Sequence, residues 1–373
     1  MRIVLTSAHC WPAVRRGGER YVHELGAALR RAGHDTRILS TGAPPRRELV
    51  QGVPVHRLPV RHAPRRWYPE PWEGLATEAA FGAQAFGHLV AGMTAGRIDV
   101  WHANTTADGA AAAAAGRLRR RTRTVFTDHG FPAAPSRSRR PDHRLHRSVV
   151  DHIDDYVCVS RAAGAYLESD FGRAPHVVPP GVRLADHRPA AARAPRPVLL
   201  YAGSLVESRK GLPLLLDAAA RLVASGVDLE LWLLGQGDPS AVLDAAPPTA
   251  RAAVTRCGLA GDDELKDAYA RAWVTVLHSR AESFGMTLVE SLACGTPGVA
   301  LADGGGPGEI ITDPAIGRLA GEGPGALADA CAEALDLARD PATASVCREH
   351  ARTWDWDSAV VPALERIYRG DAA

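Results

Sequence analysis

Short apolar runs, many of them β-branched, alternate with longer stretches rich in alanine and leucine along the chain. This alternation is typical of parallel β-sheets covered by α-helices. Apolar positions at helical spacing between Tyr21 and Leu29 predict a helix over Arg20–Arg31. The strands predicted in the first half are Arg2–Thr6, Thr36–Leu39, Val53–Leu58, Val100–His102, Thr124–Thr127, Tyr156–Val159 and His176–Val178.

A second series of elements follows Leu184–Pro197, a segment rich in Pro, Ala and Arg that we interpret as a linker. Its predicted strands are Val198–Ala202, Leu229–Leu234, Val254–Cys257, Val274–Leu277 and Gly298–Leu301. The helices predicted between and after them are Leu212–Ala224, Glu264–Arg271, Met286–Cys294 and Ala326–Ala338. The expected fold is therefore α/β, with two Rossmann-like parallel-sheet domains facing each other across a ligand-binding cleft.

We place these domains at 1–185 and 186–354, and we expect a C-terminal helix in about 355–373 to pack on the first domain. Segments 61–74 and 135–147 do not follow the alternation, and we interpret both as loops, either specificity-determining or simply solvated. Segment 61–74 contains aromatic candidates for acceptor binding, which are Trp67, Tyr68 and Trp72.

The net charge of +2 conceals a division between the two halves. Residues 1–196 contain 30 Lys and Arg against 17 Asp and Glu, whereas residues 197–373 contain 14 against 25. The basic half leaves an anionic ligand, a membrane surface or a nucleic acid open as a partner. Nucleic acid is disfavoured, because the basic half shows neither a recognition helix nor a basic sheet with interleaved aromatic residues.

The six cysteines include no C-x-x-C pair, which argues against a zinc knuckle, a redox dithiol or a disulfide scaffold. No cluster of His, Cys and carboxylate residues has ligand spacing, so we expect no metal and no other cofactor. The first apolar run is short, and no stretch approaches ~18 apolar residues. We therefore expect a cytoplasmic protein that could touch the inner membrane face peripherally.

The strongest chemical signal is ESFGMTLVE at 282–290, which follows the predicted strand Val274–Leu277. A helix beginning after Gly285 would present free N–H groups and a positive dipole end to a phosphate. Carboxylates accept hydrogen bonds from adjacent hydroxyls, so Glu282 and Glu290 suit a sugar and a ribose. The alternative is a pair of surface glutamates on either side of an ordinary helix.

A second signal is the turn GSLVESRKG at 203–211, between a predicted strand and a predicted helix. Its adjacent cations Arg209 and Lys210 suit a diphosphate, arginine as a planar fork and lysine as a point charge. The chain contains 42 Arg but only two Lys, so a lysine at this position is unusual for a chain of this composition. A basic helix-capping turn would explain neither the lysine nor the flanking glycines.

In the first half, Gly17 and Gly18 precede the Arg20–Arg31 helix, where glycine allows backbone to approach a phosphate or substrate closely. Polar residues also stand at the ends of two predicted strands, at the edge that would face the cleft. These further acceptor-side candidates are His102, Asn104, Asp128 and His129. His102 taken alone fits a satisfied core histidine better than a catalytic group. His129 is the better site candidate.

Together these segments resemble the retaining glycosyltransferases of family four, which have the GT-B fold and use nucleotide sugars. The resemblance covers nearly the whole chain and rests on the order and spacing of its motifs. These are the glycine pair at 17–18, Gly33–His34, TDHG at 127–130, Val159–Ser160, VVPPGV at 177–182, GSLVESRKG at 203–211, LLGQGD at 233–238, ELKDAYARA at 264–272 and the Glu282/Glu290 pair.

The resemblance implies transfer from a nucleoside-diphosphate sugar, a UDP-sugar by family frequency, to a small-molecule, lipid-linked or natural-product acceptor, in secondary metabolism or cell-envelope synthesis. It implies that Glu290 binds the ribose and Glu282 the sugar hydroxyls. Further donor contacts implied are Gly18, Gly203, Ser204, Arg209, Lys210, Ser283, Phe284, Gly285 and Met286. The catalytic candidates among all these groups are His129, Arg209, Lys210 and Glu282.

Three positions depart from the family pattern: Ser204 replaces a frequent Arg, Pro180 the usual Asn and Trp273 the usual Asp. Ser204 reduces by one the cations expected at the diphosphate. The alternatives left open are a nucleotide-sugar epimerase or an inverting transferase of the same fold, and a non-catalytic nucleotide-sugar-binding subunit. The glutamate pair and the 203–211 turn speak against the first two, and Ser204 alone encourages the third.

Overall fold

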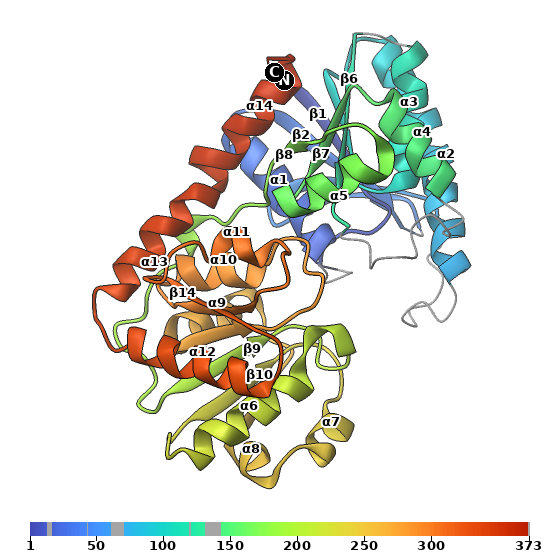
Figure 1. The fold of residues 1–373 in the computed structure, drawn as a ribbon. Helices are drawn as coiled ribbons and strands as arrows, with labels where there is room; N and C mark the ends of the chain where they lie inside the picture. Colours follow the sequence, from blue (N-terminus) through green and yellow to red (C-terminus); the bar gives the residue numbers. More distant parts are fainter. Residues whose placement is uncertain (13–16, 43, 61–70, 119–120, 131–142, 372–373) are drawn as a thin grey trace. The chain divides into compact units, whose positions relative to one another are not determined.

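The computed structural model describes residues 1–12, 17–42, 44–60, 71–118, 121–130 and 143–371, with only the backbone described for 71–75 (Figure 1). Contacts divide the chain into two compact units. Unit 1 comprises Met1–Pro180 and Trp356–Ala373, and unit 2 comprises Gly181–Asp355. The limits predicted above, 1–185 with 355–373 and 186–354, differ from this division by a few residues.

Unit 1 contains an eight-stranded sheet in the order β3-β4-β2-β1-β5-β6-β7-β8. Neighbouring strands are parallel, except that β3 runs antiparallel to β4. The strands are β1 (Arg2–Thr6), β2 (Asp35–Thr41), β3 (Arg46–Val50), β4 (Val53–Leu58), β5 (Val100–Ala103), β6 (Arg123–Asp128), β7 (Asp155–Cys158) and β8 (His176–Val177). The strand order reverses between β1 and β5, because β2 and β4 lie on one side of β1 and the later strands on the other.

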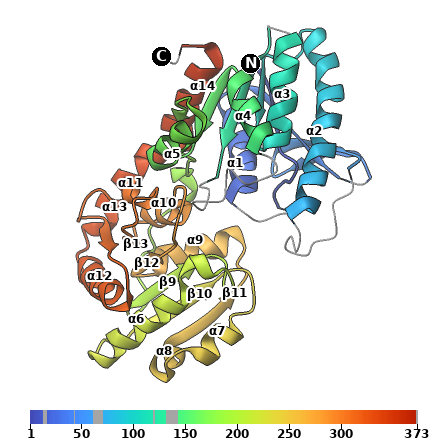
Figure 2. The ribbon, with the colours of Figure 1, turned by 45° about the vertical axis from the view of Figure 1, so that its right-hand side comes forward.

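Helices cover both faces of this sheet, because alternate residues along each strand point to opposite faces. Val4 packs with one group of helices, whereas Leu5 packs with the other. The first group is α2 (Pro71–Thr94), α3 (Thr106–Leu118), α4 (His143–His152) and α5 (Arg161–Phe171). The second group, which packs on the opposite face, is α1 (Gly17–Arg31) and α14 (Val361–Arg369). Figures 1 and 2 both show α14 on the far side of unit 1 from α2 and α3.

The C-terminal segment is fastened to unit 1 by buried polar groups as well as by apolar packing. The Tyr368 hydroxyl lies 2.7 Å from Nδ1 of His102, whose Nε2 lies 2.6 Å from the Thr127 hydroxyl. Burial lowers the pKa of His102 to about 3, so this ring is neutral at pH 7. Arg31, the last residue of α1, donates to Asp357, which precedes α14, at 2.7 Å. His102 is therefore a core residue whose two ring nitrogens both have hydrogen-bond partners, and it anchors α14 to the sheet.

Unit 2 contains six parallel strands in the order β11-β10-β9-β12-β13-β14. The strands are β9 (Val198–Ala202), β10 (Glu230–Leu234), β11 (Val254–Gly258), β12 (Val274–Leu277), β13 (Gly298–Leu301) and β14 (Gly317–Ala320). The helices are α6 (Leu212–Ala224), α7 (Ser240–Ala245), α8 (Pro248–Ala253), α9 (Asp262–Arg271), α10 (Met286–Ala293), α11 (Pro307–Ile310), α12 (Pro324–Leu337) and α13 (Thr343–Ala351). Helices α6 and α12 pack on one face, and α9 and α10 pack on the other.

The structure has every strand and helix that the apolar pattern predicted, with small shifts at the ends. It adds the strands β3 and β14 and several helices that were not predicted by range, which are α2, α3, α4, α5, α7, α8, α11 and α13. The interpretation of 61–74 and 135–147 as loops is wrong where the structure describes them, because 71–74 belong to α2 and 143–147 to α4. Helix α4 escaped detection because His146 occupies its buried face beside Val149 and Val150. Residues 61–70 and 135–142 lie outside the described residues.

The segment interpreted as a linker is also fastened to unit 2. The Arg193 guanidinium donates to the carbonyl oxygens of Ala272 and Gly295 and to the Thr296 hydroxyl. Ala194 is buried in the apolar core beside α9. Its Pro and Ala content therefore marks irregular backbone packed on a domain, not a free connection.

We expect Tyr368→Phe to lower the free energy of unfolding of unit 1 by about 1–3 kcal/mol, because buried Nδ1 of His102 loses its partner. Urea unfolding followed by circular dichroism measures the change. Arg369→Ala, on the same helix at an exposed ion pair, serves as the control and should stay within about 0.5 kcal/mol of the parent. Equal stabilities for Tyr368→Phe and the parent would contradict the role given to this hydrogen bond.

Candidate functional site

In unit 2 the strand order reverses between the neighbouring parallel strands β9 and β12. The chain leaves their carboxyl ends in opposite directions, and in open α/β sheets such a reversal point is where ligands bind. The turn 203–211 follows β9, and the loop from His278 to Gly285 follows β12. The topology therefore brings together the two segments that carry the strongest chemical signals.

Backbone contacts lock these two segments to each other. Gly211 has φ +73°, and a Cβ placed on it would lie 2.3 Å from the carbonyl oxygen of His278. The Arg280 amide donates to the carbonyl oxygen of Arg209 at 2.8 Å. Only glycine fits at 211, both because of its left-handed conformation and because of this close approach.

Three predicted residues meet where the segments touch. The Lys210 ammonium lies 2.7 Å from Oε2 of Glu282, and an Arg209 guanidinium nitrogen lies 3.7 Å from the same oxygen. The Lys210 and Glu282 side chains are 18% and 17% exposed, whereas Arg209 is 50% exposed. The site thus holds a largely buried ammonium–carboxylate pair, with the half-exposed guanidinium of Arg209 at its edge.

The glycine run after β13 supports the loop that carries Glu282. The Gly306 amide donates to the carbonyl oxygen of Glu282 at 3.0 Å, and a Cβ on Gly306 would lie 2.4 Å from Cα of Phe284. Helix α10 begins at Met286, directly after Gly285. The first N–H groups of a helix lack intrahelical acceptors, so this terminus favours an anion.

Glu290 is held separately, on the buried side of α10. Its Oε2 accepts a hydrogen bond of 2.9 Å from the hydroxyl of Tyr269 on α9, and both side chains are buried. The sequence reasoning missed Tyr269 as a positioning residue, although it lies in the ELKDAYARA motif. Glu282 and Glu290 are therefore oriented by different elements.

The remaining donor-side candidates occupy the turn and the helix start. The Ser204 hydroxyl accepts a hydrogen bond from the Glu207 amide and so stabilises the turn. An arginine is frequent at this position in the family that the sequence resembles. The Gly203 amide donates to the carbonyl oxygen of Leu234. Phe284 is buried against Trp354, and Ser283 lies between it and Glu282.

In unit 1 the strand order reverses between β1 and β5, and Asn104 and His129 lie just beyond the ends of β5 and β6. His129 Nε2 lies 3.1 Å from Oδ1 of Asn104. A Cβ on Gly18, at the start of α1, would lie 3.9 Å from the His129 ring. The Tyr21 ring meets the same imidazole edge-on at 4.6 Å. These predicted residues of the first half therefore converge.

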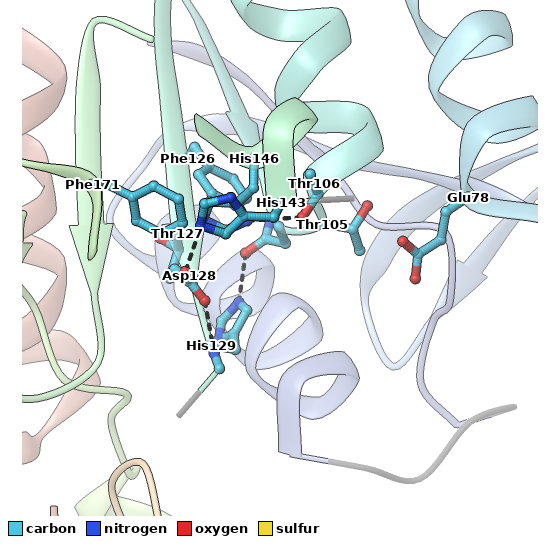
Figure 3. Close-up of a pocket in the computed structure, with 12 residues that line it drawn as sticks. Glu78, Thr105, Thr106, Phe126, Thr127, Asp128, His129, His143, His146 and Phe171 are labelled. Atoms are coloured by element: carbon cyan, nitrogen blue, oxygen red, sulfur yellow. Dashed lines mark hydrogen bonds and ion pairs between the residues drawn. The ribbon is translucent and has the colours of Figure 1, made fainter. Parts of the chain in front are cut away.

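A pocket of about 210 Å³ opens beside them (Figure 3). Its lining is Glu78, Asn104, Thr105, Thr106, Phe126, Thr127, Asp128, His129, Gly130, His143, His146 and Phe171. Three acceptor-side candidates, Asn104, Asp128 and His129, line it, whereas His102 lies buried away from it. Trp67 and Tyr68 lie outside the described residues, and so does the side chain of Trp72.

Two histidines of α4 were not found by sequence reasoning. His146 Nε2 lies 3.1 Å from Asp128 Oδ2, and its Nδ1 lies 3.1 Å from the Thr106 hydroxyl. Both His143 and His146 stack on Phe171, with ring centroids 5.3 and 4.7 Å apart. The signal that could have revealed them is their spacing of three residues, which places two side chains on one face of a helix.

The described residues contain no group of three or more His, Cys, Asp or Glu placed to hold a metal ion. All six cysteines are free thiols. No described helix combines the length and apolar character that a bilayer crossing requires.

Comparison with known proteins agrees with this architecture. Residues 15–186 match Glycosyltransferase Family 4, and residues 196–336 match Glycosyl transferases group 1. The D-inositol 3-phosphate glycosyltransferase 1 of Catenulispora acidiphila is 33% identical over 249 residues, which cover 60% of this chain. The chain spans 58% of the length of that relative.

Solved structures show the same fold over nearly the whole chain. The sucrose-phosphate synthase of Thermosynechococcus elongatus superimposes with a TM-score of 0.80 at 24% identity, covering 99% of this chain and 98% of its own. Anabaena Alr3699/HepE, solved in complex with UDP-glucose, gives 0.73 at 16% identity and covers 98% and 99%. The fold is GT-B, and the chain belongs to the family-four glycosyltransferases.

Proposed function

We propose that the chain transfers a sugar from a nucleoside-diphosphate sugar, a UDP-sugar in particular, to a hydroxyl of a small-molecule, lipid-linked or natural-product acceptor, with retention at the anomeric carbon. The observation that carries the proposal is the meeting of Arg209, Lys210 and Glu282 between the β9 and β12 loops, beside the start of α10. This arrangement offers positive charge for a diphosphate and a carboxylate for hydroxyls at one place beside the strand ends.

Each donor-side group has a distinct part in this proposal. Arg209, Lys210 and the first amides of α10 stabilise the negative charge that grows on the departing diphosphate. Glu282, positioned by Lys210, accepts hydrogen bonds from the sugar hydroxyls. Glu290, positioned by Tyr269, accepts them from the ribose. None of these parts requires a metal ion.

The proposed step breaks the bond between the anomeric carbon and the diphosphate oxygen and forms one between that carbon and the acceptor oxygen. The acceptor proton passes to the departing phosphate, so no side chain has to serve as general base. Both bonds lie on one face of the sugar, which preserves the anomeric configuration. The family resemblance supports this course of reaction.

The unit 1 pocket, with His129 at its wall, is the proposed acceptor side. The relative described above is named for an inositol phosphate acceptor, and the structure neighbour holds UDP-glucose. These two names support a hydroxyl-bearing acceptor and a uridine donor. Cytoplasmic location and peripheral membrane contact stay predictions of the sequence.

Incubation of purified protein with a panel of nucleotide sugars and hydroxyl acceptors tests the proposal. We expect nucleoside diphosphate release that depends on acceptor, a product with the donor's anomeric configuration by NMR, and unchanged rates in EDTA. An inverted product would indicate an inverting transferase, and an isomerised donor would indicate an epimerase. Donor binding without transfer or hydrolysis would indicate the accessory subunit.

We expect Lys210→Ala to lower kcat by about 100- to 1,000-fold, because one preorganised cation at the leaving group is lost. Steady-state kinetics at saturating donor measure the effect. Lys266→Ala, which removes the chain's other lysine from an exposed pair with Asp263, is the matched control and should keep parental kinetics. Full activity in Lys210→Ala would remove the leaving-group role.

We expect Glu290→Gln to raise the KM for donor by about 10- to 100-fold with little change in kcat, because a charged hydrogen bond made equally in ground and transition states is weakened. Tyr269→Phe should raise KM by a smaller factor, since it only releases the carboxylate. Glu333→Gln, at an exposed pair on α12, is the control. An unchanged donor KM in Glu290→Gln would refute the ribose assignment.

A further inference from the structure

Asn104 is the only asparagine in the chain, and its side chain makes three hydrogen bonds at the reversal point of the unit 1 sheet. Its Nδ2 donates to the carbonyl oxygen of Thr6 at 3.1 Å and to that of His102 at 3.3 Å. Its Oδ1 lies 3.1 Å from Nε2 of His129. The amide is buried, so these partners replace water.

The two carbonyl contacts fix the orientation of the amide. Carbonyl oxygens only accept hydrogen bonds, so both must face the NH₂ group of Asn104 and not its oxygen. A flipped amide would set Oδ1 against two carbonyl oxygens and leave two buried acceptors unpaired, which is costly. The side-chain oxygen must therefore face His129.

An amide oxygen can only accept, so His129 Nε2 has to carry the hydrogen. The titratable groups around this ring are Asp128, His102 and Tyr21, from β6, β5 and α1. Burial lowers the pKa of His129 to about 4 against the opposing effect of Asp128, and the ring is neutral at pH 7. In a neutral imidazole with hydrogen on Nε2, Nδ1 is an acceptor.

We propose that Asn104 is a positioning residue that locks His129 in its Nε2–H tautomer, so that Nδ1 offers a lone pair at the wall of the unit 1 pocket to a hydroxyl donor on a bound substrate. The tautomer follows from the three contacts alone. Only the substrate step rests on the proposed function. Replacement of that hydroxyl by hydrogen would then remove the bond, whereas a pure acceptor at this place, such as an ether oxygen, would be repelled.

Long-range ¹H–¹⁵N NMR of the full chain, labelled at histidine, tests the tautomer directly. The His129 signals are identified by their loss in His129→Gln. We expect a protonated Nε2 and an unprotonated Nδ1 throughout pH 6–8 in the parent protein. A His129 ring with hydrogen on Nδ1, or a mixture of tautomers, would overturn the proposal without any variant or substrate.

Two substitutions separate tautomer control from simple packing. Asn104→Ala removes the acceptor, and we expect the His129 signals to shift toward a mixture of tautomers and kcat/KM to fall about tenfold or more. His143→Gln, in the same pocket but without contact to Asn104, is the control and should leave the His129 signals unchanged. Parental His129 signals in folded Asn104→Ala would refute the role of Asn104.

Asn104→Asp gives a further test, because a purely structural role of Asn104 would not shift the pH dependence of kcat/KM. The carboxylate keeps the acceptor for Nε2–H and sets its second oxygen against the Thr6 and His102 carbonyl oxygens, which lowers stability. Its negative charge raises the pKa of His129. Protonation then takes away the Nδ1 lone pair, so the acid limb of the kcat/KM profile should move upward by about one pH unit or more. An unmoved acid limb, in a variant whose NMR titration shows the raised pKa, would refute the use of Nδ1 in substrate binding and leave the donor-side proposal intact.

Discussion

The reversal of strand order in each parallel sheet is the constraint on which both candidate sites depend. Connections in such sheets stay on their own side and do not cross, so the loops leaving two neighbouring strands must diverge. In unit 2 this happens at β9 and β12, and in unit 1 at β1 and β5. The two polar assemblies, one around Lys210 and one around Asn104, form where the diverging loops leave room beside the strand ends.

Polar groups at these points are satisfied by each other before any substrate arrives. Lys210 and Glu282 are partly withdrawn from water, and removal of Glu282 would leave the Lys210 ammonium without its carboxylate partner. Asn104 connects the backbone of β1 and β5 to the ring of His129 in the same way. Such groups are already oriented, so little reorganisation remains to be done when charge develops nearby.

The sequence predicted most of the fold because the strands are apolar runs and the helices show clear periodicity. It missed β3, where RRELV at an exposed antiparallel edge has no apolar run, and it missed α4 because its buried face carries a histidine. Strand-end residues such as Asn104 and Glu282 could be found, since position along the chain determines where they lie. Pairings between distant elements, such as Tyr269 with Glu290 and His146 with Asp128, depend on packing and could not.

The chain order of the two units has a consequence for synthesis. Unit 2 is one continuous segment, Gly181–Asp355, whereas unit 1 is completed only by Trp356 and the residues after it. The ribosome therefore delivers the whole of unit 2 while the face of unit 1 that receives α14 is still bare, with His102 lacking Tyr368. Unit 1 stays incomplete until α14 arrives, and its exposed apolar face makes the chain prone to aggregation during that interval.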